Sequence, residues 1–170
     1  RLLTLAAEKG ERRGLDVLAR CHFFGRGVAE NRAEAMRDWQ RAAEAGAATA
    51  MFACGLCLYS GEGIGADRER AVAWFRAAAG QGLSGAMFML GQCHFFGVGG
   101  VVDRAAGIEW YRRAAEAGSR EAAYELGEVH ATGRDGGHAD LHEALRWWRQ
   151  AGRLGHARAC LKIAHCYRWG

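Results

Sequence analysis

The sequence has no proline, and no stretch of it is as long and as apolar as the roughly 18 residues that a membrane-spanning helix needs. Without proline, the 25 glycines have to provide the breaks between structural elements, because glycine accepts the backbone conformations that end helices. No segment alternates polar and apolar residues with period two, so strands are not expected. The 170 residues carry a net charge of only +4, evenly spread, which favours neither nucleic-acid binding nor membrane insertion.

Motifs of catalysis and cofactor binding are missing as well. The chain contains no GxSxG, HExxH or P-loop motif, and its glycine loops are short and regular, which favours structural turns. We therefore expect no enzyme, no catalytic residues, no cofactor and no metal. An alternative with enzyme or metal chemistry would depend on cysteine and histidine. Its candidate groups are the Cys54-Gly55-Leu56-Cys57 pair and the cluster of His156, Cys160, His165 and Cys166.

The chain repeats itself. Cys21-His22-Phe23-Phe24-Gly25 recurs unchanged at 93–97, and the related segment 57–61 stands halfway between them. A fixed period in the thirties is typical of solenoids. We expect one solenoid domain over 1–170. Its full repeats are 11–46, 47–82, 83–118 and 119–155, with partial repeats at 1–10 and 156–170. Because it begins and ends within a repeat, we expect it to be an excerpt of a longer array.

Each repeat is predicted to be a helix, a glycine loop and a second helix. In 83–118, apolar and small residues recur at three- and four-residue steps up to His94, Gly97-Val98-Gly99 follows, and Asp103 is placed as an N-cap. Breaks are expected at 25–30, 61–66, 97–102 and 133–139. The same N-cap position is occupied by Asn31, Asp67 and Asp140.

Small residues at fixed positions predict close helix packing. Helices approach one another to about 8–10 Å only where their side chains are small. In the first helices this position holds Ala19, Gly55, Gly91, Gly127 and Ala164. We expect the space between helices to be filled by Trp39, Trp74, Trp110 and Trp147.

These residues resemble a known motif. Leu90-Gly91, Gly97-x-Gly99, Asp103, Trp110, Ala114-Ala115 and Gly118 are similar to the Sel-like repeat (SLR) of the tetratricopeptide-like (TPR-like) superfamily. The resemblance covers essentially the whole chain. It implies an all-α fold, a right-handed α-solenoid (superhelix) of about four and a half helix-loop-helix repeats, with the first helices lining a concave face. It also implies a protein-interaction scaffold or adaptor.

The sequence departs from that motif at a few positions. The position usually held by Tyr carries His22, Leu58, His94 and His130. Asp38 occupies the usual Trp position of the first full repeat, and Trp39 follows it. We expect the histidines to be packed with one hydrogen bond each.

All six cysteines lie on first helices. Equivalent positions in neighbouring repeats are about 10 Å apart, whereas a disulfide needs Cα atoms within about 7 Å. The resemblance to cysteine-rich secreted SLR proteins does not extend to their pairing, which uses one cysteine on each helix of a repeat. We expect six small, buried, free thiols, which favours a reducing, cytoplasmic-type compartment.

The helical wheel predicts the binding surface. At 100° per residue, an arc opposite the packing positions collects aromatic residues that a solvated face would not need. We expect a protein or peptide partner, extended or helical, to bind there. Packing of Phe23, Tyr59 and Phe95 against the next repeat is an alternative, as are stacking of copies into a larger assembly and an RNA-binding helical repeat. The predicted partner-binding residues are Phe24, Phe52, Tyr59, Phe88, Phe96 and Tyr124.

Overall fold

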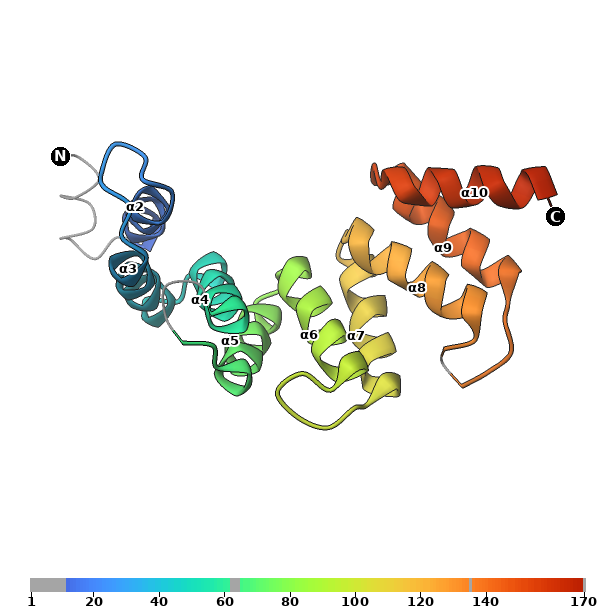
Figure 1. Cartoon of the computed structure of the whole chain (residues 1–170), viewed down its shortest axis with the longest axis horizontal. Coiled ribbons are helices and arrows are strands. Elements are labelled where there is room, and N and C mark those ends of the chain that lie inside the picture. Colours follow the sequence, from blue (N-terminus) through green and yellow to red (C-terminus); the bar gives the residue numbers. More distant parts are fainter. Residues whose placement is uncertain (1–11, 62–64, 135, 170) are drawn as a thin grey trace. The chain divides into compact units, whose positions relative to one another are not determined.

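The computed structural model describes residues 12–61, 65–134 and 136–169, and within these ranges every regular element is an α-helix of 13 residues (Figure 1). The all-α prediction is confirmed, and the helix breaks lie where they were expected. The partial repeat 1–10 is outside the described residues. The helices are α2 (Arg12–Phe24), α3 (Arg32–Glu44), α4 (Ala48–Ser60), α5 (Arg68–Gly80), α6 (Ser84–Phe96), α7 (Arg104–Glu116), α8 (Arg120–Thr132), α9 (Leu141–Arg153) and α10 (Ala157–Trp169).

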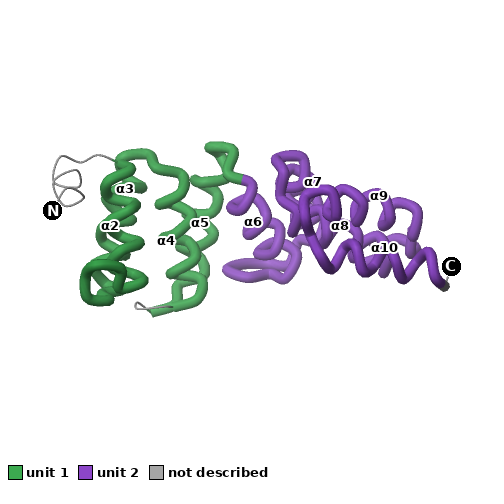
Figure 2. The backbone as a smooth tube through the Cα atoms, turned by 90° about the horizontal axis from the view of Figure 1, so that it is seen from above, with its two compact units in different colours: residues 1–83 green, residues 84–170 purple. Residues whose placement is uncertain are grey.

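The helices form two compact units, residues 1–83 and residues 84–170 (Figure 2). In the first unit α2 packs on α3, α3 on α4, and α4 on α5. In the second unit α6 packs on α7, α7 on α8, α8 on α9, and α9 on α10. Each helix thus packs mainly on its neighbours in the sequence, as in repeat proteins. The description of 1–170 as one domain stays a prediction.

The helix ends follow from the residues at them. Gly61 and Gly133 close α4 and α8 at φ values of 75° and 65°, where only glycine is unstrained. Ser119 caps α8 by accepting a hydrogen bond from the N–H of Ala122 at 3.2 Å. The predicted N-caps of the second helices are confirmed, since each accepts a backbone N–H bond. They are Asn31, Asp67, Asp103 and Asp140.

An aromatic ring rests directly on the small residue of the first helix. A Cβ atom added to Gly91 would lie 2.4 Å from Cδ1 of Tyr111, and one added to Gly127 would lie 2.3 Å from Cδ1 of Trp148. Such distances are below van der Waals contact, so only glycine admits the ring. The rings that rest on the glycines of the first helices are those of Phe75, Tyr111 and Trp148, and the corresponding ring of the first repeat, that of Trp39, is also buried.

The predicted set of filling aromatics was therefore wrong at two positions. Trp74 and Trp110 are only half-buried, whereas Phe75 and Tyr111 are buried. Trp147 is buried, but the ring against Gly127 belongs to the next residue. One residue turns a helix by about 100°, which decides which of two adjacent rings faces the first helix.

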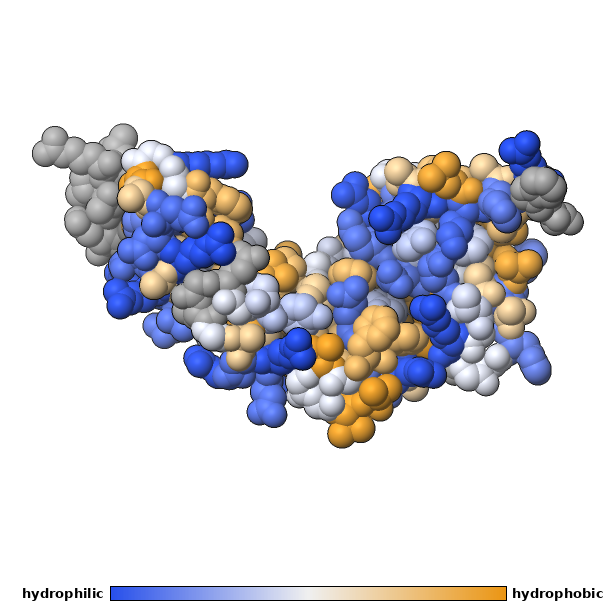
Figure 3. All heavy atoms as spheres, viewed as in Figure 1, coloured by the Kyte–Doolittle hydropathy of each residue, from blue (hydrophilic) through white to orange (hydrophobic). Residues whose placement is uncertain are grey.

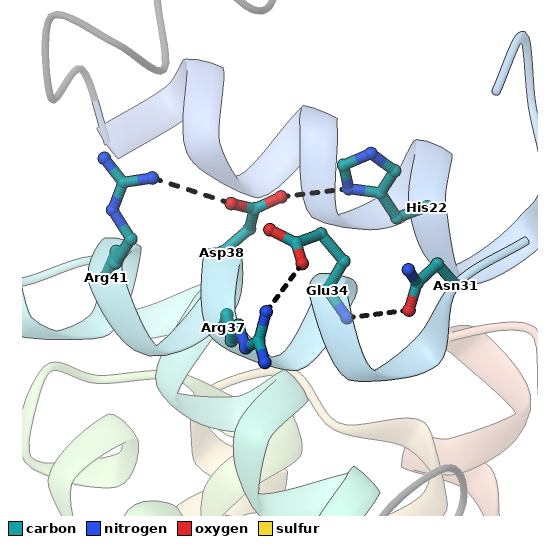
Figure 4. A network of polar contacts seen from close by, with 6 residues as sticks. All are labelled: His22, Asn31, Glu34, Arg37, Asp38 and Arg41. Carbon is teal, nitrogen blue, oxygen red and sulfur yellow. Dashed lines mark hydrogen bonds and ion pairs between the residues drawn. The ribbon is translucent and has the colours of Figure 1, made fainter. Parts of the chain in front are cut away.

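Asp38 is the buried charged residue of the first unit, and its side chain is 5% exposed. Its Oδ1 lies 3.8 Å from Nη1 of Arg41, and its other oxygen faces His22 of α2 (Figure 4). A carboxylate can remain charged at such a depth only with partners of this kind. On the exposed side of α3, Glu34 pairs with Arg37 at 3.0 Å.

Candidate functional site

An apolar cleft of about 410 Å³ lies between α2 and α4 in the first unit, and is here called the α2–α4 cleft. Phe24 is 57% exposed at its rim and Leu56 is 38% exposed. Large apolar side chains that remain in water at a hollow are characteristic of interaction sites. The cleft is lined by Arg20, Phe23, Phe24, Trp39, Thr49, Phe52, Ala53, Leu56, Cys57 and Leu83.

The walls of the α2–α4 cleft are held by ring packing. Phe23 lies between two rings, with its centroid 5.0 Å from that of Phe24 and 5.3 Å from that of Trp39. The ring of Phe52 rests against Phe75, with centroids 5.8 Å apart. Because its aromatic partners fix Phe23 and support Phe52, the hollow is largely formed before any partner arrives.

The carboxylate of Asp16 makes polar contacts with all three helices around this cleft. Nε1 of Trp39 donates to Oδ1 of Asp16 at 3.0 Å, and the hydroxyl of Thr49 donates to Oδ2 at 3.4 Å. Arg20 contacts the same carboxylate at 3.4 Å. The carboxylate thereby joins α2, α3 and α4, and its charge is matched by the adjacent guanidinium.

A second cleft of about 370 Å³ lies between α8 and α10 in the second unit, and is here called the α8–α10 cleft. Tyr124 forms one wall, and its ring stacks on the ring of His156, with centroids 4.4 Å apart. Leu161 is 70% exposed. Figure 3 shows apolar and charged side chains interspersed along α10. The cleft is lined by Tyr124, Arg158, Leu161, Lys162 and His165.

Lys162 is held in place from two sides. Its Nζ lies 2.9 Å from Oε1 of Glu128 and 5.6 Å from the centroid of the Trp148 ring. The hydrogen bond with Glu128 raises the pKa of Lys162, so its ammonium group stays charged. Burial and the charge of Glu128 raise the pKa of Glu125 as well, but for a carboxyl group this disfavours the charged form.

On the α4 and α10 sides, the two clefts use the same positions of the repeat. In the repeat register, Thr49, Phe52 and Leu56 of α4 correspond to Arg158, Leu161 and His165 of α10. Ala53 corresponds in the same way to Lys162. The walls that α4 and α10 contribute thus use the same repeat positions, with apolar chemistry in one case and cationic chemistry in the other. The opposite walls differ, since Tyr124 of α8 corresponds to Asp16 of α2.

The six predicted binding residues divide among these surroundings. Phe24 and Phe52 meet in the α2–α4 cleft, and Tyr124 lines the α8–α10 cleft. Tyr59, Phe88 and Phe96 line neither of them. Of the six predicted residues, only Phe24 and Phe52 line the same cleft.

The three residues outside the clefts have different environments. The half-buried ring of Tyr59 lies against Phe75, and that of Phe88 against Tyr111, with centroids 6.3 and 5.8 Å apart. Phe96 is 59% exposed and stands edge-on to Phe95. Phe95 is buried, as the packing alternative proposed.

Sequence reasoning missed the basic residues of the second cleft. Arg158, Leu161, Lys162 and His165 follow one another at steps of three, one and three residues, which places them on one helical face. At 100° per residue, Arg158 lies within the arc that the helical wheel assigned to binding and Lys162 lies just outside it, but neither was named as a binding residue. The spacing itself could have revealed them as a group.

The cysteines show no site of their own. All six are free thiols in the structure; Cys54, Cys57 and Cys93 are buried, whereas Cys160 is exposed, contrary to a uniform set of buried thiols. Burial raises the pKa of Cys54 to about 12 and that of Cys93 to about 11, which keeps both protonated and unreactive. Among the described residues, no three side chains of the metal-binding types lie together.

None of the described helices has both the length and the apolar character that crossing a bilayer requires.

Comparison with known proteins places the repeats in a family. The model of the Sel1 repeat matches residues 16–46, 48–83, 84–119 and 120–156. The chain belongs to the Sel1 repeat family. The predicted Sel-like, TPR-like repeat solenoid is thereby confirmed. Sel1 repeat proteins are generally protein-interaction scaffolds and typically have no catalytic role.

Solved structures of Sel1 proteins resemble the chain closely. It matches c5321, a protective antigen present in uropathogenic Escherichia coli strains, with a TM-score of 0.86 and 26% identity over 99% of this chain. It matches a Sel1 repeat protein from Oxalobacter formigenes with a TM-score of 0.83 and 30% identity over 94% of this chain. The chain spans 36% and 65% of those two proteins.

A more distant likeness shows the fold alone. Cysteine rich protein B of Helicobacter pylori is 19% identical, with a TM-score of 0.59, over 74% of this chain and 90% of that one. No curated protein matches the sequence.

Proposed function

We propose that this chain is a protein-interaction scaffold whose first-helix face binds a partner segment through apolar side chains. The observation that carries the proposal is the α2–α4 cleft, in which Phe24 remains 57% exposed and Leu56 38% exposed. The general role of Sel1 repeat proteins as interaction scaffolds supports it. The occupant is an extended or helical segment of a partner protein that inserts an aliphatic or aromatic side chain.

The energetics favour such an occupant. Burying a large apolar side chain contributes about 1.5–3 kcal/mol, and binding hot spots are typically aromatic anchors in preformed hollows. The rings of Phe23 and Phe52 are already packed, so binding orders few additional side chains. The proposal keeps Tyr59, Phe88 and Phe96 as further contacts of the same face, with Phe96 supported by its exposure.

A selection experiment tests this function. Random peptides displayed on phage are selected against the folded chain, and the affinity of synthetic versions is measured by fluorescence anisotropy. We expect apolar peptides whose affinity falls by about tenfold or more in Phe24→Ala and in Leu56→Ala. Phe24 is 57% exposed and Leu56 38% exposed, so neither is a core residue and circular dichroism should show an unchanged fold.

Val101→Ala is the matched control. Val101 is an exposed apolar residue, 88% accessible, in the loop between α6 and α7 and outside both clefts. Its replacement should leave affinity unchanged. The proposal is wrong if the selected peptides bind both cleft variants as tightly as the parent. A mass that rises with concentration in sedimentation, without peptide binding, would instead favour the self-assembly alternative.

A further inference from the structure

The charges of the α8–α10 cleft point to a second specificity. We propose that this cleft recognises an acidic side chain adjacent to an apolar one in a protein segment. The inference rests on the proposed function in taking a protein segment as the occupant, but it concerns the other unit of the chain and a different chemistry.

Charge complementarity identifies the occupant. The lining of the α8–α10 cleft contains the cations Arg158 and Lys162 together with His165, and no carboxylate lines it. Arg158 and His165 are exposed, so a partner can reach them. The carboxylate of Glu128 engages Lys162 from beside the cleft, which positions that ammonium group. Aspartate or glutamate is the protein side chain that matches such a lining.

The apolar part of the occupant follows from Leu161. This side chain is 70% exposed and lies between Arg158 and His165 along the face of α10. The rise of an α-helix puts Arg158 and His165 about 10 Å apart. A segment with an apolar side chain over Leu161 therefore places a neighbouring carboxylate, within about one helical turn, next to a cation.

A protein segment fits this cleft better than single-stranded nucleic acid does. Proteins that bind single strands stack bases on aromatic rings. The phenol ring of Tyr124 in the lining is already stacked on His156. The exposed residue at the centre of the face is aliphatic, and offers no stacking surface to a base.

The first unit provides an internal comparison. At the positions of Arg158, Lys162 and His165, the α2–α4 cleft has Thr49, Ala53 and Leu56. The same hollow thus lacks ionisable side chains at these three positions in one unit and carries them in the other. The acidic preference is expected of the second unit only.

The experiment uses the whole chain and two sets of short peptides, acetylated and amidated at their ends. In the first set a Leu lies within about one helical turn of Asp or Glu; in the second, Asn or Gln replaces the acid. We expect the acidic set to bind at least about tenfold more tightly, measured by fluorescence anisotropy, and to weaken as salt is added. Arg158→Glu should remove the preference.

Two controls separate the possible outcomes. Arg112→Glu makes the same charge change on an exposed arginine of α7, outside the cleft, and should keep the preference. Phe24→Ala should keep it too, because the α2–α4 cleft is not involved. If Phe24→Ala weakens both sets equally while no acidic preference exists, the proposed function stands and this inference fails. If Arg158→Glu alone acts, the inference stands, and the function of the α2–α4 cleft is decided separately by the selected apolar peptides.

Three results would overturn the inference. These are equal binding of both peptide sets, no binding of the acidic set up to about 1 mM, and a preference that survives Arg158→Glu. A single-stranded RNA oligonucleotide that displaces the acidic peptides, and that itself depends on Arg158, would reassign the cleft to nucleic acid.

Discussion

Nδ1 of His22 lies 3.0 Å from Oδ2 of Asp38, across the contact between α2 and α3. These two residues are the departures of the first repeat from the Sel1 pattern, in which a Tyr and a Trp are usual. The structure shows that they are partners (Figure 4): the buried carboxylate of Asp38, at the usual Trp position, is paired with the imidazole of His22, at the usual Tyr position. The substitutions therefore depend on each other.

Removing one partner should reveal this dependence. Asp38→Ala leaves the half-buried His22 without its carboxylate and should lower the free energy of unfolding by about 1–3 kcal/mol. Urea unfolding of Asp38→Ala, His22→Ala and the double variant measures the coupling. We expect the two single losses in free energy of unfolding, added together, to exceed the loss in the double variant by about 1 kcal/mol. Additive effects would show that the contact contributes nothing.

Gly91 is the sharpest test of the ring-on-glycine contact. Gly91→Ala would place Cβ 2.4 Å from the ring of Tyr111, and should cost about 1–3 kcal/mol through overpacking. Gly80→Ala is the matched control at the end of α5, where an added Cβ meets nothing within 4 Å. Because alanine favours helices, the control should be neutral or stabilising by up to about 1 kcal/mol. Thermal unfolding of both variants decides the matter.

The thiols should differ in reactivity according to their burial. A chromogenic disulfide reagent should modify the exposed Cys160 first and should reach Cys54 and Cys93 only after unfolding. In denaturant without reductant, the titration should count six thiols. A count of four or fewer would contradict the expectation of a reducing compartment.

Cys54 should also make stability depend on alkaline pH. Its pKa is raised by burial, and by Cys57, from 9.0 to about 12. Below pH 9 both states hold the proton and stability is complete; above it the unfolded state loses the proton first, so stability falls as pH approaches 12, by at most about 1.4 kcal/mol per pH unit. Cys54→Ala should make the decline measured by urea unfolding shallower. Cys160→Ala should leave it as in the parent.

Phe88 and Leu90 separate binding from packing. Leu90 is fully buried, and Leu90→Ala should cost about 2–5 kcal/mol. Phe88 is half-buried against Tyr111, so Phe88→Ala should destabilise less while weakening partner affinity at least about tenfold. The two variants are compared by urea unfolding and by titration with a verified peptide. Equal destabilisation with unchanged affinity would make Phe88 a core residue and remove it from the binding face.

The helices and their ends could be predicted because each depends on a few neighbouring residues. Asp103 caps α7, and Gly133 closes α8, through contacts within one turn of the chain. The choice between adjacent rings could not be made in this way. Trp74 and Phe75 are both aromatic and both fit a helix, and only the contact with Gly55 in another helix decides which one is buried.

The helix face that carries the candidate site could be predicted from the sequence, but the side chains that line its clefts could not. The helical wheel placed Phe24, Phe52 and Tyr124 on the surface where clefts occur. It could not show that Phe88 leans on Tyr111 instead of lining a cleft, because the direction of a side chain depends on its packing partners. The basic character of α10 was visible in the spacing, but it matters only because a hollow lies beside it.

The contact between ring and glycine has a consequence for how such arrays diversify. It fixes the spacing of the two helices within a repeat, and it uses an arc of the first helix that is separate from the cleft positions. Those positions lie about 60° to 160° further around the helix. Thr49 and Arg158 occupy the same one of these positions on α4 and α10, which shows that the position can carry neutral or ionic chemistry. On α4 the ring of Phe75 lies on Gly55, away from Thr49. Selection can therefore retune one repeat's ligand preference without re-engineering its neighbours.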